Sequence, residues 1–191
     1  MNEIHLIRTQ LRAERERVGA VARACAAALA GTDPQTLAPG SAPEELRQAS
    51  AEYLACVLEW FEARDERLRE LYARRPSADP ERRSVEKMLG GGGSSREALE
   101  RLERAAGRAA SETDDSSGSR QELRWQELAR FIAGPWTGRR EAIERALSSN
   151  PRVADWRAIG GIDADSILDE RRRYARVRQH LPPGTAAPAG S

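Results

Sequence analysis

The sequence predicts an all-α fold, an up-down four-helix-bundle-like domain with additional short helices. Apolar residues recur every three or four positions over long stretches, which is the spacing of a helix that buries one face. Aromatic residues make up only 5% of the chain, and long runs of Val, Ile and Thr are missing, which argues against a β-rich fold. Charged residues make up 32% and hydrophobic residues 39%, as expected for helices that bury one stripe and solvate the rest.

The length of 191 residues suits one well-packed domain. We expect residues 1–181 to form a single helical-bundle domain and residues 182–191 a flexible C-terminal tail. The first residues do not resemble a signal peptide, and no apolar run approaches about 18 residues, so we expect a soluble, cytoplasmic protein with no membrane contact. The 31 basic residues nearly balance the 30 acidic ones, which leaves no overall footprint for nucleic acid.

The first expected helix begins near Asn2, a good N-cap, and runs to about Ala30. Its apolar residues alternate in threes and fours, as a helix that faces other helices requires. Glu14 falls in this series between Leu11 and Val18. It is the first charge that the pattern places on an inward face.

A second long helix is expected from a capping box at Ser41 and Glu44 to about Arg74, before Pro76. At 100° per residue, one set of residues lies within about 40° of a single line along this helix. The set contains Leu54, Val57, Phe61, Asp65, Leu68 and Tyr72. Asp65 is therefore a second charge on an inward face.

The middle of the chain predicts two short helices, at 79–89 and 94–110, joined through a glycine run that suits a flexible hinge. The acidic stretch 111–118 predicts an exposed or disordered loop. A long helix is then expected from a cap at Ser119 to about residue 148, with a kink near 131–135 where Gly134 and Pro135 interrupt it.

Arg139 follows this kink and continues the apolar line that includes Ile132, Trp136 and Ile143, provided that the phase survives. It is the third inward charge. A short segment, 153–159, is expected to pack a Trp across one end of the bundle, and a final helix spans about 163–180.

Glu14, Asp65 and Arg139 must pair, reach water or bind something, because an unpaired buried charge costs several kcal/mol. One interpretation is that Arg139 bridges the two carboxylates in a shared interior. The alternative is that each charge sits at the solvent edge of its helix.

The long helices with inward polar residues near their middles resemble the hemerythrin-like (HHE cation-binding) family. The resemblance implies a left-handed four-helix bundle whose core holds two iron ions on His and carboxylate ligands. Where the family's second helix carries His-x-x-x-Glu, this chain has Phe61 and Asp65. Where a later helix is expected to supply a His, it has Trp136 or Thr137.

Only His5 and His180 are present in the chain, so a histidine-rich di-iron site cannot be assembled. The resemblance therefore implies a degenerate member of the family that lacks the metal-ligand histidines. Phe61 and Trp136 would line or fill the former site together with an ion pair. We predict no metal, no cofactor and no catalytic residue, with non-heme iron as the alternative.

Motifs of catalysis, such as Gly-x-Ser-x-Gly and His-Glu-x-x-His, are absent from the sequence. The expected function is non-catalytic binding of a partner protein or a small ligand, with a homodimer as one natural form. The alternative is a hemerythrin-like non-heme iron protein for oxygen sensing or iron handling. Nucleic-acid binding through the Arg-rich final helix ranks last, because Asp165, Asp169 and Glu170 dilute its basic face.

Overall fold

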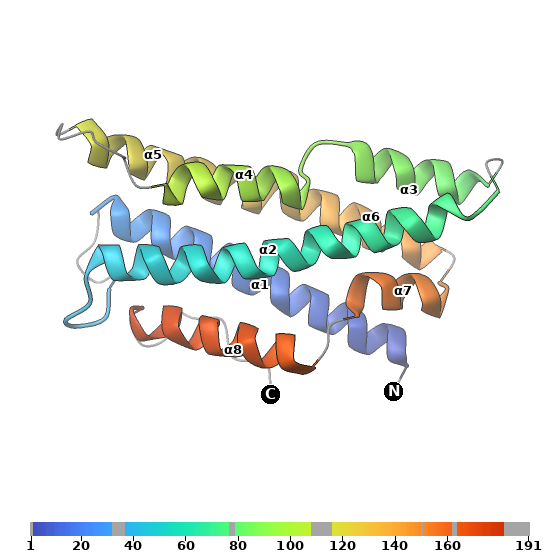
Figure 1. The fold of residues 1–191 in the computed structure, drawn as a ribbon, viewed down its shortest axis with the longest axis horizontal. Helices are drawn as coiled ribbons and strands as arrows, with labels where there is room; N and C mark the ends of the chain where they lie inside the picture. The colour runs from blue at the N-terminus through green and yellow to red at the C-terminus, as the bar shows by residue number, and fades with distance from the viewer. Residues whose placement is uncertain are drawn as a thin grey trace.

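Every regular element in the described part of the chain is helical. The computed structural model describes residues 2–31, 37–76, 79–107, 116–149, 151–161 and 164–181. Within these ranges the chain forms an all-α bundle that contains no strand (Figure 1), which confirms that the fold is an all-α helical bundle. No helix in these ranges is long and apolar enough to cross a membrane. The tail at 182–191 and residues 111–115 of the predicted loop lie outside the described residues.

Two long helices pack against each other in the middle of the molecule (Figure 1). Helix α1 is Glu3–Leu29, and its N-cap Asn2 accepts a hydrogen bond from the Ile4 amide at 3.2 Å. Helix α2 is Pro43–Ala73. The predicted capping box is wrong by one residue, because Ala42 is the N-cap and its amide donates to Glu45 at 3.1 Å.

Two shorter helices, α3 (Pro80–Gly90) and α4 (Ser95–Ala106), follow one another along one side of α2 (Figure 1). Each begins where a side-chain cap predicts it. Asp79 accepts from the Glu81 amide at 2.9 Å, and Ser94 accepts from the Glu97 amide at 3.0 Å. These caps satisfy amide groups that the first turn of a helix leaves without a partner.

The next three elements form one continuous path: α5 (Ser116–Phe131), the π-helical turn η2 (Ile132–Trp136) and α6 (Thr137–Ser149). The predicted start at Ser119 is wrong, since the helix already includes residues 116–118. The predicted kink falls at η2, which contains Pro135. Helix α5 packs against α1 and α4, whereas α6 packs mainly against α3. The π turn therefore directs the second half of this path away from α1.

Gly93 lies where the connection between α3 and α4 touches this turn. Its φ of +84° favours glycine, and a Cβ atom there would lie 2.5 Å from the Pro135 carbonyl oxygen. Only glycine allows the backbone of this connection to approach η2 so closely. One part of the predicted hinge is thus a fixed packing position.

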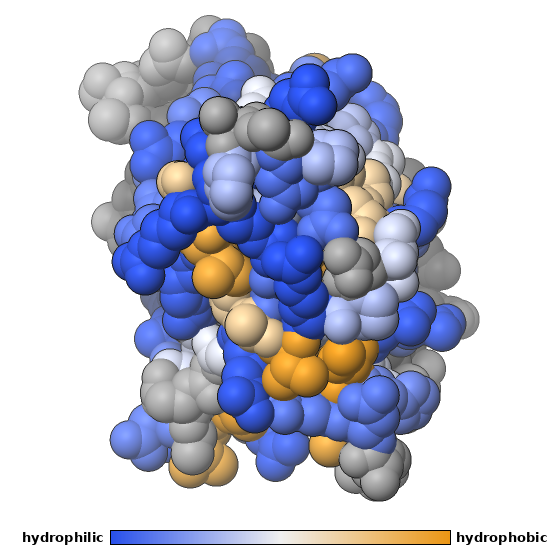
Figure 2. Space-filling view, turned by 90° about the vertical axis from the view of Figure 1, so that its right-hand side faces the viewer, coloured by the Kyte–Doolittle hydropathy of each residue, from blue (hydrophilic) through white to orange (hydrophobic). Residues whose placement is uncertain are grey.

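Helix α7 (Val153–Gly160) packs against α1 and α2, and α8 (Ala164–Gln179) packs against α2. Trp156 of α7 is fully buried, as expected for a Trp packed across one end of the bundle. Figure 2 shows the face at the right-hand side of Figure 1, where hydrophilic side chains separate a few small hydrophobic patches. Cys25 is buried, Cys56 is half-buried, and both are free thiols.

Candidate functional site

The three charges that the sequence pattern places inward are buried in the structure. The exposed fraction is 3% for Glu14, 0% for Asp65 and 7% for Arg139. They do not meet as one triad, however. Glu14 pairs with one arginine and Asp65 with two others, so the interpretation that Arg139 bridges both carboxylates is wrong.

Glu14 pairs with Arg64, a residue on α2 that is itself fully buried. The Arg64 Nη1 atom donates to Glu14 Oε2 at 2.6 Å, and Nη2 donates to Oε1 at 3.2 Å. Gln10 donates a third hydrogen bond to the same carboxylate at 3.1 Å. A bidentate guanidinium pair with further hydrogen bonds is the arrangement that best offsets the desolvation of two buried charges.

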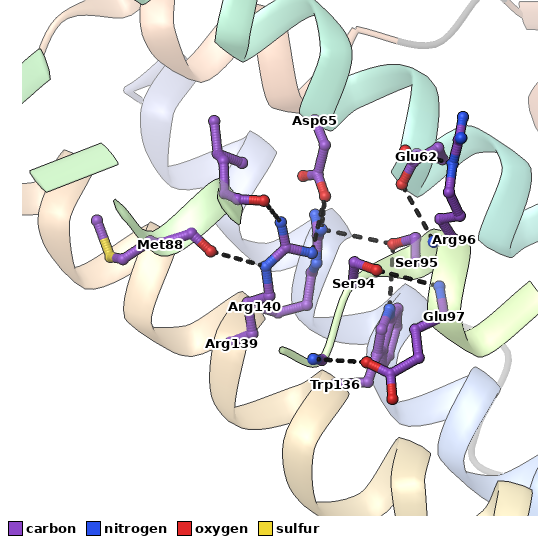
Figure 3. A network of polar contacts seen from close by, with 12 residues as sticks. Glu62, Asp65, Met88, Ser94, Ser95, Arg96, Glu97, Trp136, Arg139 and Arg140 are labelled. Carbon is purple, nitrogen blue, oxygen red and sulfur yellow. Dashed lines mark hydrogen bonds and ion pairs between the residues drawn. The ribbon is translucent and has the colours of Figure 1, made fainter. Parts of the chain in front are cut away.

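Asp65 pairs with both arginines of the Arg139–Arg140 sequence on α6 (Figure 3). Arg140 Nη2 donates to Asp65 Oδ2, and Arg139 Nη1 lies 3.2 Å from the same oxygen. Arg140 also lies 3.4 Å from the hydroxyl of Ser95 at the start of α4. This contact set ties α6 to α2 and α4.

The other donors of Arg139, Nε and Nη2, bind carbonyl groups at the end of α3. Its Nε donates to the Met88 carbonyl at 2.9 Å and its Nη2 to the Leu89 carbonyl at 2.8 Å (Figure 3). Carbonyl groups in the last turn of a helix lack partners within the helix, and a cation there is favoured by the helix dipole. Burial lowers the pKa of Arg139, and the nearby Asp65 carboxylate opposes that shift. Arg139 therefore caps α3.

Phe61 and Trp136 occupy the space between these ion pairs. Their rings meet edge to face, with centroids 5.0 Å apart. The guanidinium carbons of Arg64 and Arg140 lie 4.8 Å and 5.1 Å from the Phe61 ring centroid. Trp136 Nε1 donates to the Ser95 hydroxyl at 3.2 Å, so this indole is also held in place (Figure 3).

We call Glu14, Arg64, Asp65, Arg139 and Arg140 the core network. Three guanidinium groups face two carboxylates in it, so it carries one positive charge in excess. Over the described residues, no group of three or more His, Cys, Asp or Glu side chains is placed to hold a metal ion. The network pairs its cations with carboxylates and helix carbonyls, although four of its buried atoms form no hydrogen bond within the described residues: Arg64 Nε, Asp65 Oδ1, Arg139 Nη1 and Arg140 Nε.

Arg64 and Arg140 were missed by the sequence prediction, although a signal for both exists. Arg64 lies three residues after Phe61 and four before Leu68, and Arg140 lies four after Trp136 and three before Ile143. Both thus occupy positions with the spacing of buried residues. Arg64 adjoins Asp65 and Arg140 adjoins Arg139 in the sequence. Because the neighbour already fits the buried stripe, a long cationic side chain beside it is expected at the solvated edge of the helix.

A second feature lies at the surface, where α6 diverges from α1. There the structure has a groove of about 930 Å³, which we call the α1–α6 groove. One wall is a face of α1 and the other is formed by η2 and α6. It is lined by His5, Arg8, Thr9, Arg12, Arg15, Glu16, Gly19, Ala20, Arg23, Ala133, Thr137, Glu141 and Glu144.

Arg15 spans the groove and pairs with Glu144 on the opposite wall. Arg12 pairs with Glu16 one turn along α1, with 2.8 Å between Nε and Oε1, and both side chains are exposed. Arg8 stacks over Trp156 at 5.9 Å. Burial raises the pKa of Glu144 even though Arg15 and Arg140 attract its charged form. The carboxylate of Glu144 therefore lines the groove and also interacts electrostatically with Arg140.

Comparisons of this chain with protein-family models, with curated proteins and with solved structures each found no match. The chemistry of the candidate site is therefore identified by its own residues.

Proposed function

We propose that this chain is a non-catalytic helical-bundle protein that binds a small ligand in the α1–α6 groove, and that its core is a metal-free scaffold. The observation that carries the proposal is the groove itself, which lies between the π turn with α6 and a row of arginines on α1. Its volume of about 930 Å³ lies within the range of small-molecule sites. Single π turns within α-helices also occur often at functional sites.

A metal-free core is supported by what occupies its centre. In a hemerythrin-like protein, ligands would project from the positions of Phe61 and Trp136. Here these positions hold two aromatic rings in edge-to-face contact, flanked by guanidinium groups. Guanidinium groups do not ligate metals, and their charge repels cations. We include in the proposal that the chain is a degenerate relative of the hemerythrin-like family.

A small ligand is favoured over a partner helix by the composition of the groove. Helix-in-groove recognition relies on large apolar anchors, whereas the apolar side chains that line this groove are Ala20 and Ala133. A catalytic role lacks support from the same residues. The Thr137 hydroxyl donates to the Ile132 carbonyl at 2.7 Å, so it is engaged in the π turn.

The test of the core is metal analysis of protein purified from iron-supplemented cells. We expect far less than one iron per chain, and no increase in melting temperature on adding Fe(II), Mn(II) or Zn(II). Stoichiometric iron with an oxo-bridge absorption band would support the alternative, a hemerythrin-like iron protein, and would overturn this part of the proposal.

The test of the groove is a thermal-shift panel of charged and neutral metabolites, run on the wild type and on Ala133→Trp. Ala133 is exposed in the groove, so a Trp there fills the space without disturbing buried residues. Compounds that stabilise the wild type should lose their effect in the variant. Stabilisation that persists in Ala133→Trp would place binding elsewhere.

A further inference from the structure

The α1 wall of the groove carries four arginines that differ in whether they form ion pairs: Arg8, Arg12, Arg15 and Arg23. Arg15 is bound to Glu144. Arg8 and Arg23 form no ion pair with any residue that the structure describes; Arg8 lies over the Trp156 ring and its charge favours ionised Glu144, but neither contact uses its N–H donors. Arg12 is held only by the exposed pair with Glu16, and such surface pairs contribute little. Three guanidinium groups are thus available to a ligand.

The spacing of these arginines suits one multivalent anion. Residues 8, 12 and 15 lie on one side of α1 and span about 10 Å along its axis, at 1.5 Å per residue. A phosphate group has several acceptor oxygens and up to two negative charges, so it can accept hydrogen bonds from more than one guanidinium fork. A single carboxylate, by contrast, pairs with the two N–H donors of only one guanidinium group.

The charge behind the groove acts in the same direction. The four arginines of the lining face three carboxylates, those of Glu16, Glu141 and Glu144, so the lining carries one positive charge in excess. The core network behind it carries another. Arg140 of that network lies close enough to Glu144 to favour its charged form, so the two regions are electrostatically continuous.

The opposite wall, formed by η2 and α6, favours different chemical groups on the ligand. Glu141 is exposed on α6 and forms no ion pair with any residue within the described ranges. A free carboxylate in a site for anions would repel the phosphate, but it is a strong acceptor for hydroxyl groups. A ligand that carries hydroxyl groups beyond its phosphate satisfies both walls.

We propose that the α1–α6 groove binds a phosphorylated sugar, with its phosphate held by Arg8 and Arg12 on α1 and its hydroxyl groups by Glu141 on α6. This deepens the proposed function and rests on it. The shared chemistry is a phosphate ester of a sugar, which a free sugar phosphate and a nucleotide both contain. Ribose 5-phosphate and adenosine monophosphate are the probes that distinguish these two sources.

The test is calorimetric titration with ribose 5-phosphate, adenosine monophosphate, ribose and inorganic phosphate. At least one of the two phosphate esters should bind more tightly than ribose or phosphate alone. If ribose 5-phosphate binds and adenosine monophosphate does not, the ligand is a free sugar phosphate, and the reverse identifies a nucleotide. Binding of neither ester at millimolar concentration overturns the inference.

Single variants on each wall test which one binds the phosphate and which one binds the hydroxyl groups. Arg8→Gln should weaken both the ester and inorganic phosphate by at least about tenfold, as expected for the loss of a hydrogen bond to a charged group. Glu141→Gln should weaken the ester but leave inorganic phosphate unchanged or tighter, because a repulsive charge is removed. Arg171→Gln, on the exposed face of α8, is the control and should change neither.

Two further results would overturn the inference. An ester affinity that is unchanged in Arg8→Gln places the phosphate elsewhere, and an ester affinity that rises in Glu141→Gln denies that carboxylate a role in binding hydroxyl groups. This inference fails while the proposed function stands if neutral compounds bind, if Ala133→Trp abolishes their binding, and if Arg8→Gln leaves their affinity unchanged. If no compound is blocked by Ala133→Trp, the proposed function fails as well.

Discussion

Arg64 and Glu14 join α2 to α1 through two N–H···O contacts of 2.6 Å and 3.2 Å, in a region where both side chains are buried. Such a pair is costly to desolvate, and its main effect on stability is seen when one partner is lost. The remaining charge then has no compensation in the interior. This pair therefore holds the two central helices in one relative orientation.

Glu14→Leu should lower the free energy of unfolding by about 3–5 kcal/mol, because it leaves Arg64 charged and unpaired in the core. The double variant Glu14→Leu/Arg64→Leu should recover much of that loss. Urea unfolding monitored by circular dichroism measures both. Arg12→Gln, exposed on the same helix, is the control and should leave stability unchanged. Equal and additive losses would show that the two residues do not interact.

Asp65 should couple more strongly to Arg140 than to Arg139. Arg140 donates directly to Asp65, whereas Arg139 directs two of its donors to the carbonyls of α3. A double-mutant cycle of Asp65→Ala with Arg140→Met should give an interaction free energy of about 1–3 kcal/mol, and the cycle with Arg139→Met a smaller one. A larger coupling to Arg139 would reverse this assignment.

Gly93→Ala should destabilise the fold more than Gly40→Ala. The two glycines have nearly the same φ, +84° and +82°, so both substitutions carry the cost of a left-handed backbone, about 1–2 kcal/mol. A Cβ at Gly93 also meets the Pro135 carbonyl at 2.5 Å, while one at Gly40 meets nothing within 4 Å. The difference between the two urea midpoints measures the packing against the π turn. Equal midpoints would show that the backbone between α3 and α4 can shift to accept the Cβ atom without lowering the free energy of unfolding.

Glu144 should make stability fall as pH rises through the acidic range. Its pKa in the folded protein is raised above the ordinary value of 4.5, mainly by burial, so the folded state binds more protons than the unfolded state between 4.5 and the raised value. The stability of the wild type relative to Glu144→Gln is therefore greatest below pH 4.5, and it declines until the raised pKa is passed.

Urea unfolding at several pH values between 4 and 7 measures this decline. Glu127→Gln, at an exposed position on α5, is the control and should show no such change relative to the wild type. If the wild type instead gains stability over Glu144→Gln with rising pH, the attraction of Arg15 for the charged form outweighs the burial of Glu144.

Local signals in the sequence were sufficient where one side chain decides a helix start. Asn2, Asp79 and Ser94 are caps as predicted, because each needs only an amide two or three residues away. Ser41 and Ser119 failed as caps. Each lies among other residues able to begin a helix, and the choice among them depends on packing that no short window contains.

Periodicity places Glu14, Asp65 and Arg139 on faces that the structure buries, but it does not identify their partners. Pairing depends on the rotation of one helix against another across 50 residues for Glu14 and Arg64. The α1–α6 groove was beyond prediction for a related reason. It lies where η2 joins α5 to α6, and η2 contacts Gly93 and Ser95, which are about 40 residues away in the sequence.

Binding of a ligand in the α1–α6 groove should leave the ion pairs of the core network formed. The most direct measurement is NMR of the arginine Nε–H groups during titration with ribose 5-phosphate, with each signal assigned by substitution. We predict that the signals of Arg8 and Arg12 shift in a saturable way, while those of Arg64 and Arg140 stay in place. Shifts centred on Arg64 and Arg140, with Arg8 and Arg12 unchanged, would contradict the account.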